Sequence, residues 1–230
     1  MDRPVDERTL AVFDLDGTVT RRDTLLPFIG GFLLRHPWRL WRVSLCLGPA
    51  LRYALGDRDR GRLKGAILRR TLGGVTRTAL ERWGRQFSVR LLRHGLYGEA
   101  LDCIAAHRRA QAHLVLLSAS PDLYVPAVAA ALGFDECICT AVRWRADDTL
   151  DGELAGPNRR GAEKTRCVTE LLNEQQPLLS YAYGNSEADV EHLKLVSAGT
   201  YVNGSASEVA GCPNVHAVRW HRRGLASPLP

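Results

Sequence analysis

The sequence predicts an α/β protein with a Rossmann-like parallel sheet, helices on both faces, and a small all-helical insertion after the first strand. Three observations support this fold class. Short apolar runs alternate along the chain with segments of helical periodicity, which is typical of βαβ units. Several of these runs lead directly into polar residues. One long stretch, residues 25–95, is helical in character and contains no convincing strand.

The predicted strands are short apolar segments. Residues 10–16 (LAVFDLD) are apolar until they meet two acids, as in a buried strand whose end opens onto a site. Residues 112–120 (AHLVLLSAS) predict a second buried strand. Residues 136–142 (ECICTAV) predict a third, with alternating positions. Residues 178–186 and 199–205 predict the fourth and fifth strands.

Helices are predicted between these strands from apolar residues at helical spacing. They cover residues 97–111, 121–134, 162–175 and 187–196. Residues 151–161 are polar and predict a loop, and residues 219–230 predict a surface tail. The N-terminal stretch 1–10 is charged and has no apolar h-region, so we expect no signal peptide there.

Residues 25–95 form the predicted insertion. Gly73, Gly74, Gly95 and Gly98 punctuate its apolar, helix-spaced segments. We therefore expect a core of residues 1–24 and 96–230, interrupted by a helical unit of residues 25–95.

Positive charge is concentrated in this insertion. The chain has 31 basic and 25 acidic residues, a net charge of +6. Residues 35–70 contain ten of the basic residues, opposed only by Asp57 and Asp59. This surplus suits phosphate esters, anionic lipid headgroups or nucleic acid, and a solvated helical face is the alternative. No nucleic-acid-binding module or aromatic platform is present, so we expect no nucleic-acid partner.

The six cysteines show neither Cys-x-x-Cys spacing nor a nearby histidine pair, which argues against a zinc site. Reduced thiols in a cytoplasmic protein are the simplest interpretation.

Polar clusters follow three of the predicted strands: Asp14 and Asp16, Ser118 and Ser120, and residues 184–186 (Gly-Asn-Ser). The carboxyl ends of parallel strands form the binding edge of such sheets, so we expect the clusters to converge. Oxygen ligands of this kind suit Mg²⁺, and a carboxylate can also attack phosphorus.

The motifs, taken together, resemble those of the haloacid dehalogenase superfamily. FDLDGTVT (13–20) resembles its Asp-x-Asp-x-Thr signature. VLLSAS (115–120), the lysine of RGAEK (160–164) and YGNSEADVEHL (183–193) are similar to the later signatures, in the same order. The helical insertion resembles the small cap of the subgroup that contains phosphoserine phosphatases. Residues 32–51 are also similar in character to the cap of phosphatidylglycerophosphatase C.

The resemblance implies a Mg²⁺-dependent phosphatase and gives each motif residue a role. Asp14 would attack phosphorus. Asp16 would offer its backbone carbonyl to Mg²⁺, protonate the leaving alcohol and then activate water. Lys164 would neutralise charge beside Asp14. The remaining implied roles are binding of the phosphoryl group or substrate by Ser118, Ala119, Thr18 and Asp23, and completion of the metal site by Asn185 and Asp189, directly or through water.

The sequence departs from the family pattern at two places, which concern metal affinity and substrate choice. Asn185 stands where the superfamily often has Asp, which removes one negative charge from the metal site. Ala188 replaces an Asn that is usual in phosphoserine phosphatases, whereas Asp23 falls where that family carries a Glu facing the substrate amine.

Each motif residue also has an ordinary structural interpretation. Ser118 could be a helix N-cap, Lys164 a first-turn helix lysine and Asp189 a surface acid. A catalytically weak phospho-ligand-binding relic of the same fold is the alternative function. Retention of Asp14, Asp16 and Lys164 argues against that alternative, because binding alone does not need the nucleophile.

The insertion leaves two substrate classes open. Residues 40–55 are too short and too charged to span a bilayer, yet their arginines and tryptophan suit a helix lying in its interface. That interpretation favours a lipid-linked phosphate and peripheral membrane contact, whereas a helix packed on its neighbours favours a small soluble phosphomonoester. The oligomeric state is open too.

Overall fold

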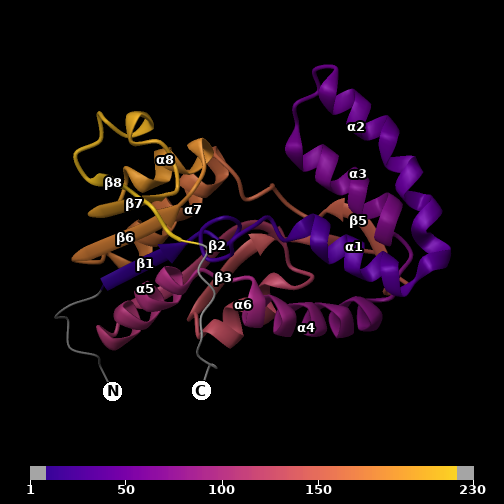
Figure 1. Ribbon diagram of the computed structural model, residues 1–230, viewed down its shortest axis with the longest axis horizontal. Coiled ribbons are helices and arrows are strands. Elements are labelled where there is room, and N and C mark those ends of the chain that lie inside the picture. Colours follow the sequence, from indigo (N-terminus) through magenta and orange to yellow (C-terminus); the bar gives the residue numbers. More distant parts are fainter. Residues whose placement is uncertain (1–8, 222–230) are drawn as a thin grey trace.

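The computed structural model describes residues 9–221 and confirms the predicted fold class (Figure 1). Six parallel strands form one sheet in the order β3-β2-β1-β6-β7-β8. The strands are β1 (Thr9–Phe13), β2 (His113–Pro121), β3 (Glu136–Thr140), β6 (Leu179–Gly184), β7 (Ala198–Val202) and β8 (Val215–Val218). The predictions for residues 1–8 and 222–230 lie outside the described residues.

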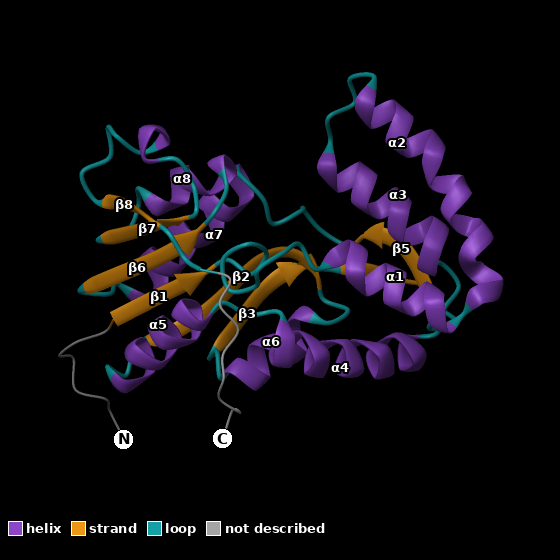
Figure 2. Cartoon of the chain, in the orientation of Figure 1, coloured by secondary structure: helices purple, strands orange, loops and turns teal. Residues whose placement is uncertain are grey.

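Strand β1 occupies the middle of the sheet because its apolar residues are buried on both faces. Ala11 and Phe13 pack in one core cluster, and Leu10 and Val12 in the other. The first cluster includes residues of α5 (Gly98–Arg109) and α6 (Val125–Leu132), and the second those of α7 (Ala162–Gln175) and α8 (Glu187–Leu193). Helices therefore cover both faces of the sheet (Figure 2).

A helical lobe follows β1 and lies beyond the carboxyl end of the sheet (Figure 1). Its elements are α1 (Leu25–Arg35), the 3₁₀ helix η1 (Pro37–Cys46), α2 (Leu47–Ala54), α3 (Arg60–Leu72) and α4 (Arg77–His94). Asp59 caps α3 by accepting from two backbone amides, and Thr76 caps α4. The indole of Trp83 in α4 donates to the carbonyl of Phe28 in α1 at 3.0 Å, which joins these two helices.

A β-hairpin corrects the prediction of a polar loop at residues 151–161. Strands β4 (Val142–Trp144) and β5 (Leu150–Leu154) pair antiparallel, so the first residues of the expected loop are extended. The backbone of Leu150 exchanges hydrogen bonds with Gly74 and Val75, which connects the hairpin to the helical lobe. The division of the chain into a core of residues 1–24 and 96–230 and a helical unit of residues 25–95 stays a prediction.

The structure differs from the predicted strands at two further places. Strand β3 does not alternate, because its first four residues are all half-buried and only Thr140 is fully buried. Strand β8 was not expected, since four residues at a sheet edge carry little periodic signal. The six cysteines are free thiols. Within residues 9–221, no helix is long and apolar enough to cross a membrane.

Candidate active site

The predicted polar clusters meet in one cavity of about 730 Å³ between the carboxyl edge of the sheet and the helical lobe. Six basic and four acidic side chains line it. They are Arg21, Arg22, Arg60, Lys64, Arg160 and Lys164, with Asp14, Asp16, Asp23 and Asp189. Basic groups around a carboxylate pair suit a substrate that carries a phosphate dianion.

Asp14 follows the last residue of β1 and is 6% exposed. Its Oδ1 accepts a hydrogen bond from Lys164 Nζ at 2.5 Å, and its Oδ2 accepts one from the Thr18 hydroxyl at 3.1 Å. Burial raises the pKa of Asp14 to about 7, although the ammonium of Lys164 opposes that rise. Two contacts thus orient this carboxylate toward the cavity.

Lys164 lies in the first turn of α7, but it is only 3% exposed and so differs from an ordinary surface lysine of a helix. Its Nζ also contacts Asp189 Oδ1 at 2.8 Å, so one ammonium bridges two buried carboxylates. Burial alone would lower the pKa of Lys164, but the charges of Asp14 and Asp189 raise it. Burial would raise the pKa of Asp189, yet the charge of Lys164 holds it well below its usual value.

Asp189 is not a surface acid: it is buried at the start of α8. Its Oδ2 accepts from the amide and the hydroxyl of Ser186 at 3.0 and 2.6 Å, which completes a capping box. Gly184 allows this approach, because a Cβ there would meet the Asp189 Cβ at 2.6 Å. With both oxygens engaged, Asp189 is suited to holding Lys164 in place.

Asp16 belongs to a separate hydrogen-bond network. Its Oδ2 accepts from the Ser120 hydroxyl at 2.5 Å, and its Oδ1 from the amide and hydroxyl of Thr24 at 2.8 and 2.6 Å. Thr24 in turn shares a hydrogen bond with the Tyr124 hydroxyl at 2.8 Å. Burial raises the pKa of Asp16, and the negative charge of Asp23 adds to the rise. The two acids of the first motif therefore have different partners.

Asn185 lies between β6 and α8 and shares the Thr18 hydroxyl with Asp14. This hydroxyl lies 3.1 Å from Asp14 Oδ2 and 3.4 Å from Asn185 Oδ1. Gly17 has a φ of +82°, and a Cβ there would stand 2.1 Å from Asn185 Nδ2. Only glycine combines this left-handed conformation with such a close approach.

Ser118 is completely buried within β2, so it is not a helix N-cap. Its hydroxyl accepts from the Ser120 amide at 3.0 Å, whereas Ala119 and Ser120 line the cavity. The contact of Ser120 with Asp16 was not foreseen, although the sequence places Ser120 at the same strand end. Asp23 also lines the cavity, and its Oδ1 accepts from the Leu25 amide at 3.0 Å.

Lys64 of α3 was not predicted to reach the site. Its Nζ donates to the carbonyl of Ala119 and, at 2.5 Å, to Asn158 Oδ1. Burial lowers the pKa of Lys64 to about 8, while Asp16 and Asp23 oppose the shift. The contact connects the helical lobe to the core, and nothing in the local sequence around Lys64 indicates it.

The donor set fits a hard cation. Among residues 9–221, no group of three or more His, Cys, Asp or Glu side chains could hold a metal by itself. The available donors are instead oxygens of Asp14 and Asn185, which both lie near the Thr18 hydroxyl. Mg²⁺ commonly uses one or two carboxylates and fills its other positions with waters and substrate phosphate. The residues present therefore suit Mg²⁺ better than a metal that needs an all-protein cage.

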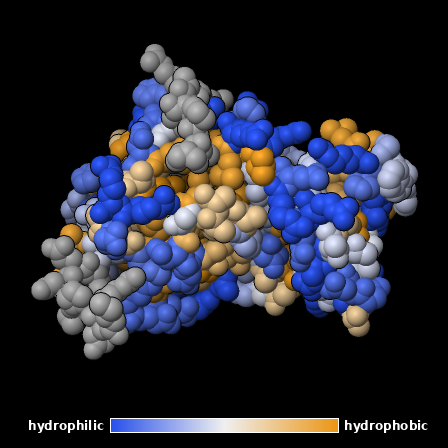
Figure 3. Space-filling view, turned by 90° about the horizontal axis from the view of Figure 1, so that it is seen from below, coloured by the Kyte–Doolittle hydropathy of each residue, from blue (hydrophilic) through white to orange (hydrophobic). Residues whose placement is uncertain are grey.

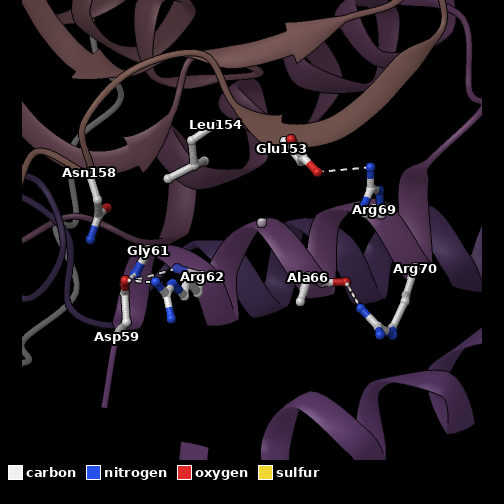
Figure 4. A pocket seen from close by; sticks show the side chains of 10 residues that line it. Asp59, Gly61, Arg62, Ala66, Arg69, Arg70, Glu153, Leu154 and Asn158 are labelled. Carbon is white, nitrogen blue, oxygen red and sulfur yellow. Dashed lines mark hydrogen bonds and ion pairs between the residues drawn. The ribbon is translucent and has the colours of Figure 1, made fainter. Parts of the chain in front are cut away.

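A second cavity, of about 460 Å³, lies between α3 and β5 (Figure 4). Arg69 and Glu153 form an ion pair across it at 2.9 Å, and Asp59 accepts from the amides of Gly61 and Arg62. These charged groups are engaged with each other. The ion pair between Arg69 and Glu153 joins α3 of the lobe to β5 of the hairpin.

Comparison with known proteins agrees with this fold. A family model of haloacid dehalogenase-like hydrolases matches residues 11–194. The chain belongs to this family. Protein CicA of Caulobacter vibrioides is 34% identical over 199 residues, which cover 85% of this chain and 86% of CicA.

Two solved structures share the fold of this haloacid dehalogenase-like hydrolase. A Bordetella pertussis protein of unknown function has a TM-score of 0.75 at 24% identity, covering 92% of this chain and 98% of that one. A phospho-aspartyl intermediate analogue of phosphoserine phosphatase has a TM-score of 0.62 at 13% identity, covering 91% and 93%.

Proposed function

We propose that this chain is a Mg²⁺-dependent phosphomonoester hydrolase that works through an aspartyl-phosphate on Asp14. The observation that carries the proposal is the environment of the two acids. Asp14 is oriented by Lys164 and Thr18, and Asp16 by Ser120 and Thr24, within one basic cavity. The family membership and the likeness to a phosphoserine phosphatase support the same chemistry.

In the first step, a carboxylate oxygen of Asp14 attacks the phosphorus of the ester. The bond from phosphorus to the alcohol oxygen breaks, and Asp16 donates a proton to that oxygen. The raised pKa of Asp16 favours the protonated carboxyl that this role requires. Lys164 holds positive charge beside Asp14 while negative charge builds up on the phosphoryl group.

In the second step, Asp16, now a carboxylate, takes a proton from a water molecule that attacks the phosphorus. The bond to Asp14 breaks, inorganic phosphate leaves, and Asp16 is protonated again. Ala119 and Ser120 line the cavity beside these acids, and we expect the Ala119 amide to bind a phosphoryl oxygen, since the Ser120 amide donates to Ser118. Ser118 supports this turn through its bond from the Ser120 amide.

Asp14, Asn185 and the backbone carbonyl of Asp16 would hold Mg²⁺, with Asp189 acting through Lys164 or through water. When bound, this cation neutralises phosphate charge and favours the ionised form of Asp14. Asn185 supplies a neutral oxygen where a carboxylate is common, so we expect weaker metal affinity than an Asp at this position would give.

We further propose that residues 25–95 act as a cap that selects the substrate. Leu25, Leu26, Tyr53, Leu63 and Ile67 line the cavity on its lobe side. Apolar residues on this side suit the organic part of a small phosphorylated metabolite or of a lipid-linked phosphate.

The six free thiols support a reducing compartment such as the cytoplasm.

Hydrolysis of p-nitrophenyl phosphate with and without Mg²⁺ tests the proposal, with Asp14→Asn and Asp135→Asn compared in parallel. Asp135 lies outside the cavity, so its substitution should keep the wild-type rate, whereas Asp14→Asn should abolish turnover. Full activity of Asp14→Asn would refute the mechanism. If a panel of phosphoserine, sugar phosphates, nucleotides and phosphatidylglycerophosphate is bound but not hydrolysed, the chain is a ligand-binding relic.

A further inference from the structure

The surface of residues 34–55 is exceptionally apolar. Nine of the fourteen large exposed hydrophobic side chains in the described structure lie in this segment. We define the apolar stripe as its six most exposed members, Leu34, Trp38, Trp41, Leu47, Leu51 and Leu55. Neither η1 nor α2 contains a buried residue, although helices in proteins are stabilised mainly by packing an apolar face. A patch of this kind on a folded protein marks an interaction surface.

Three members of the stripe have the spacing of a single helical face along α2 and its C-cap residue Leu55. Leu47, Leu51 and Leu55 are four residues apart and are 71%, 60% and 78% exposed. Tyr53 lies on the other side of the same helix and lines the catalytic cavity. Helix α2 therefore separates the cavity from the apolar stripe. In the view from below, the helical lobe is mainly hydrophilic, with a small group of hydrophobic residues at its outer edge (Figure 3).

Contacts with the rest of the lobe fix the segment that carries the stripe. Arg39 and Arg42 in η1 both donate to the carbonyl of Gly73, at 2.7 and 3.0 Å, and so fasten η1 to the end of α3. The guanidinium of Arg35 lies 4.3 Å from the ring centroid of Trp83 in α4. Because these inward contacts use arginine side chains, the tryptophans and leucines between them point outward.

The distribution of charge along the chain indicates an anionic partner. Residues 35–70 carry ten basic and two acidic residues, a net charge of +8, so the rest of the chain carries −2. An apolar face with tryptophan, surrounded by arginine, is the composition of a helix that lies in the interface of an anionic bilayer. A second copy of the chain would bring another segment with a surplus of positive charge against the first, which like-charge repulsion opposes.

We propose that the apolar stripe docks this protein peripherally on anionic lipid bilayers. Trp38, Trp41 and the leucines of the stripe enter the headgroup region, and the exposed arginines Arg52 and Arg58 are available to the anionic lipids. This docking brings the cavity, which lies across α2, close to the membrane surface. The inference concerns binding alone and stands whether or not the chain hydrolyses phosphate esters.

Sedimentation with sucrose-loaded vesicles tests the docking. We expect the wild-type protein to bind vesicles of phosphatidylglycerol and phosphatidylcholine at low salt, and to bind pure phosphatidylcholine at least tenfold more weakly. The double variant Leu47→Glu/Leu51→Glu should lower the apparent partition coefficient at least tenfold. The matched control is Leu178→Glu/Leu179→Glu, which adds the same charge at two exposed leucines outside the lobe and should still bind.

Tryptophan fluorescence locates the contact. Brominated phosphatidylcholine in the anionic vesicles should quench the wild-type protein, and Trp38→Phe/Trp41→Phe should lose that quenching. Circular dichroism and the urea midpoint of each variant establish that it is folded. Absence of binding to anionic vesicles at low salt, or equal binding by Leu47→Glu/Leu51→Glu, would overturn the proposal. A dimer in light scattering that this variant dissociates, without vesicle binding, would assign the stripe to self-association instead.

Discussion

Replacement of Lys164 by Met removes the one ammonium that bridges Asp14 and Asp189. The side chain of Lys164 is 3% exposed and lies 2.5 and 2.8 Å from the two carboxylates. Methionine has a similar shape, so the variant isolates the charge. Breaking a buried ion pair from one side costs about 3–5 kcal/mol, because it leaves a buried charge without a partner. We expect a loss of this size in the free energy of unfolding.

The loss should depend on pH, because Asp14 can take up a proton. The folded-state pKa of Asp14, about 7, lies above its ordinary value. The stability that its protonated form contributes is therefore complete at low pH and is lost as the pH rises through 7. Without Lys164 that pKa rises further, and the variant continues to lose stability above pH 7 while the wild-type protein does not. Each such pH unit is worth about 1.4 kcal/mol. The variant should therefore lose about 1.4 kcal/mol more at pH 8 than at pH 5.5.

Urea unfolding at the two pH values measures this difference. Lys194→Met is the matched control, since it removes an exposed lysine that lies 2.7 Å from Glu191. An exposed pair contributes about 0–1 kcal/mol, so this control should change stability little at either pH. A loss below 1 kcal/mol for Lys164→Met, or an equal loss at pH 5.5 and 8, would refute the account of the buried charges.

Two further predictions concern the site. Ser120→Ala removes a hydrogen bond that lowers the pKa of Asp16, so that pKa should rise and the alkaline limb of the pH profile of kcat should move to higher pH; an unchanged limb would contradict the acid role of Asp16. Gly17→Ala places a Cβ against Asn185 at a φ of +82° and should cost about 1–2 kcal/mol of stability and weaken the Mg²⁺ dependence of the rate severalfold. Gly156→Ala, at an open position, is its control in the same urea and Mg²⁺ titrations, and equal behaviour of the two alanine variants would exclude a role for this close approach.

Local signals in the sequence were sufficient for the elements that carry the motifs. The apolar run before Asp14 predicted β1, because a strand buried on both faces must be apolar throughout. The periodic segment 162–175 coincides with α7 and so placed Lys164 in its first turn. The convergence of the strand-end residues Asp14, Ser120 and Asn185 on one cavity follows from a rule about parallel sheets, which holds for any chain of this class.

Other features depend on contacts between distant segments and left no local pattern. Strand β5 contains Asp151 and Glu153, whose charges argue against a strand. It forms because it pairs with β4, because Leu150 bonds to residues 74–75, and because Arg69 and Arg143 neutralise those charges. Lys64 enters the site only because α3 packs against the hairpin and directs it to the Ala119 carbonyl. Such contacts join residues far apart in the chain, so neither periodicity nor spacing reveals them.

By itself, the sequence determined the fold class, the family resemblance and the pair of acids at the end of β1, because these depend on local hydrophobicity and on the order of short motifs. Only the tertiary structure decided which partners distinguish the two acids: Lys164 and Thr18 for Asp14, Ser120 and Thr24 for Asp16. It also decided that the apolar residues of η1 and α2 remain exposed. The physical reason is that pKa values, hydrogen bonds and burial depend on what the folded chain brings within a few ångströms, whatever the distance in sequence.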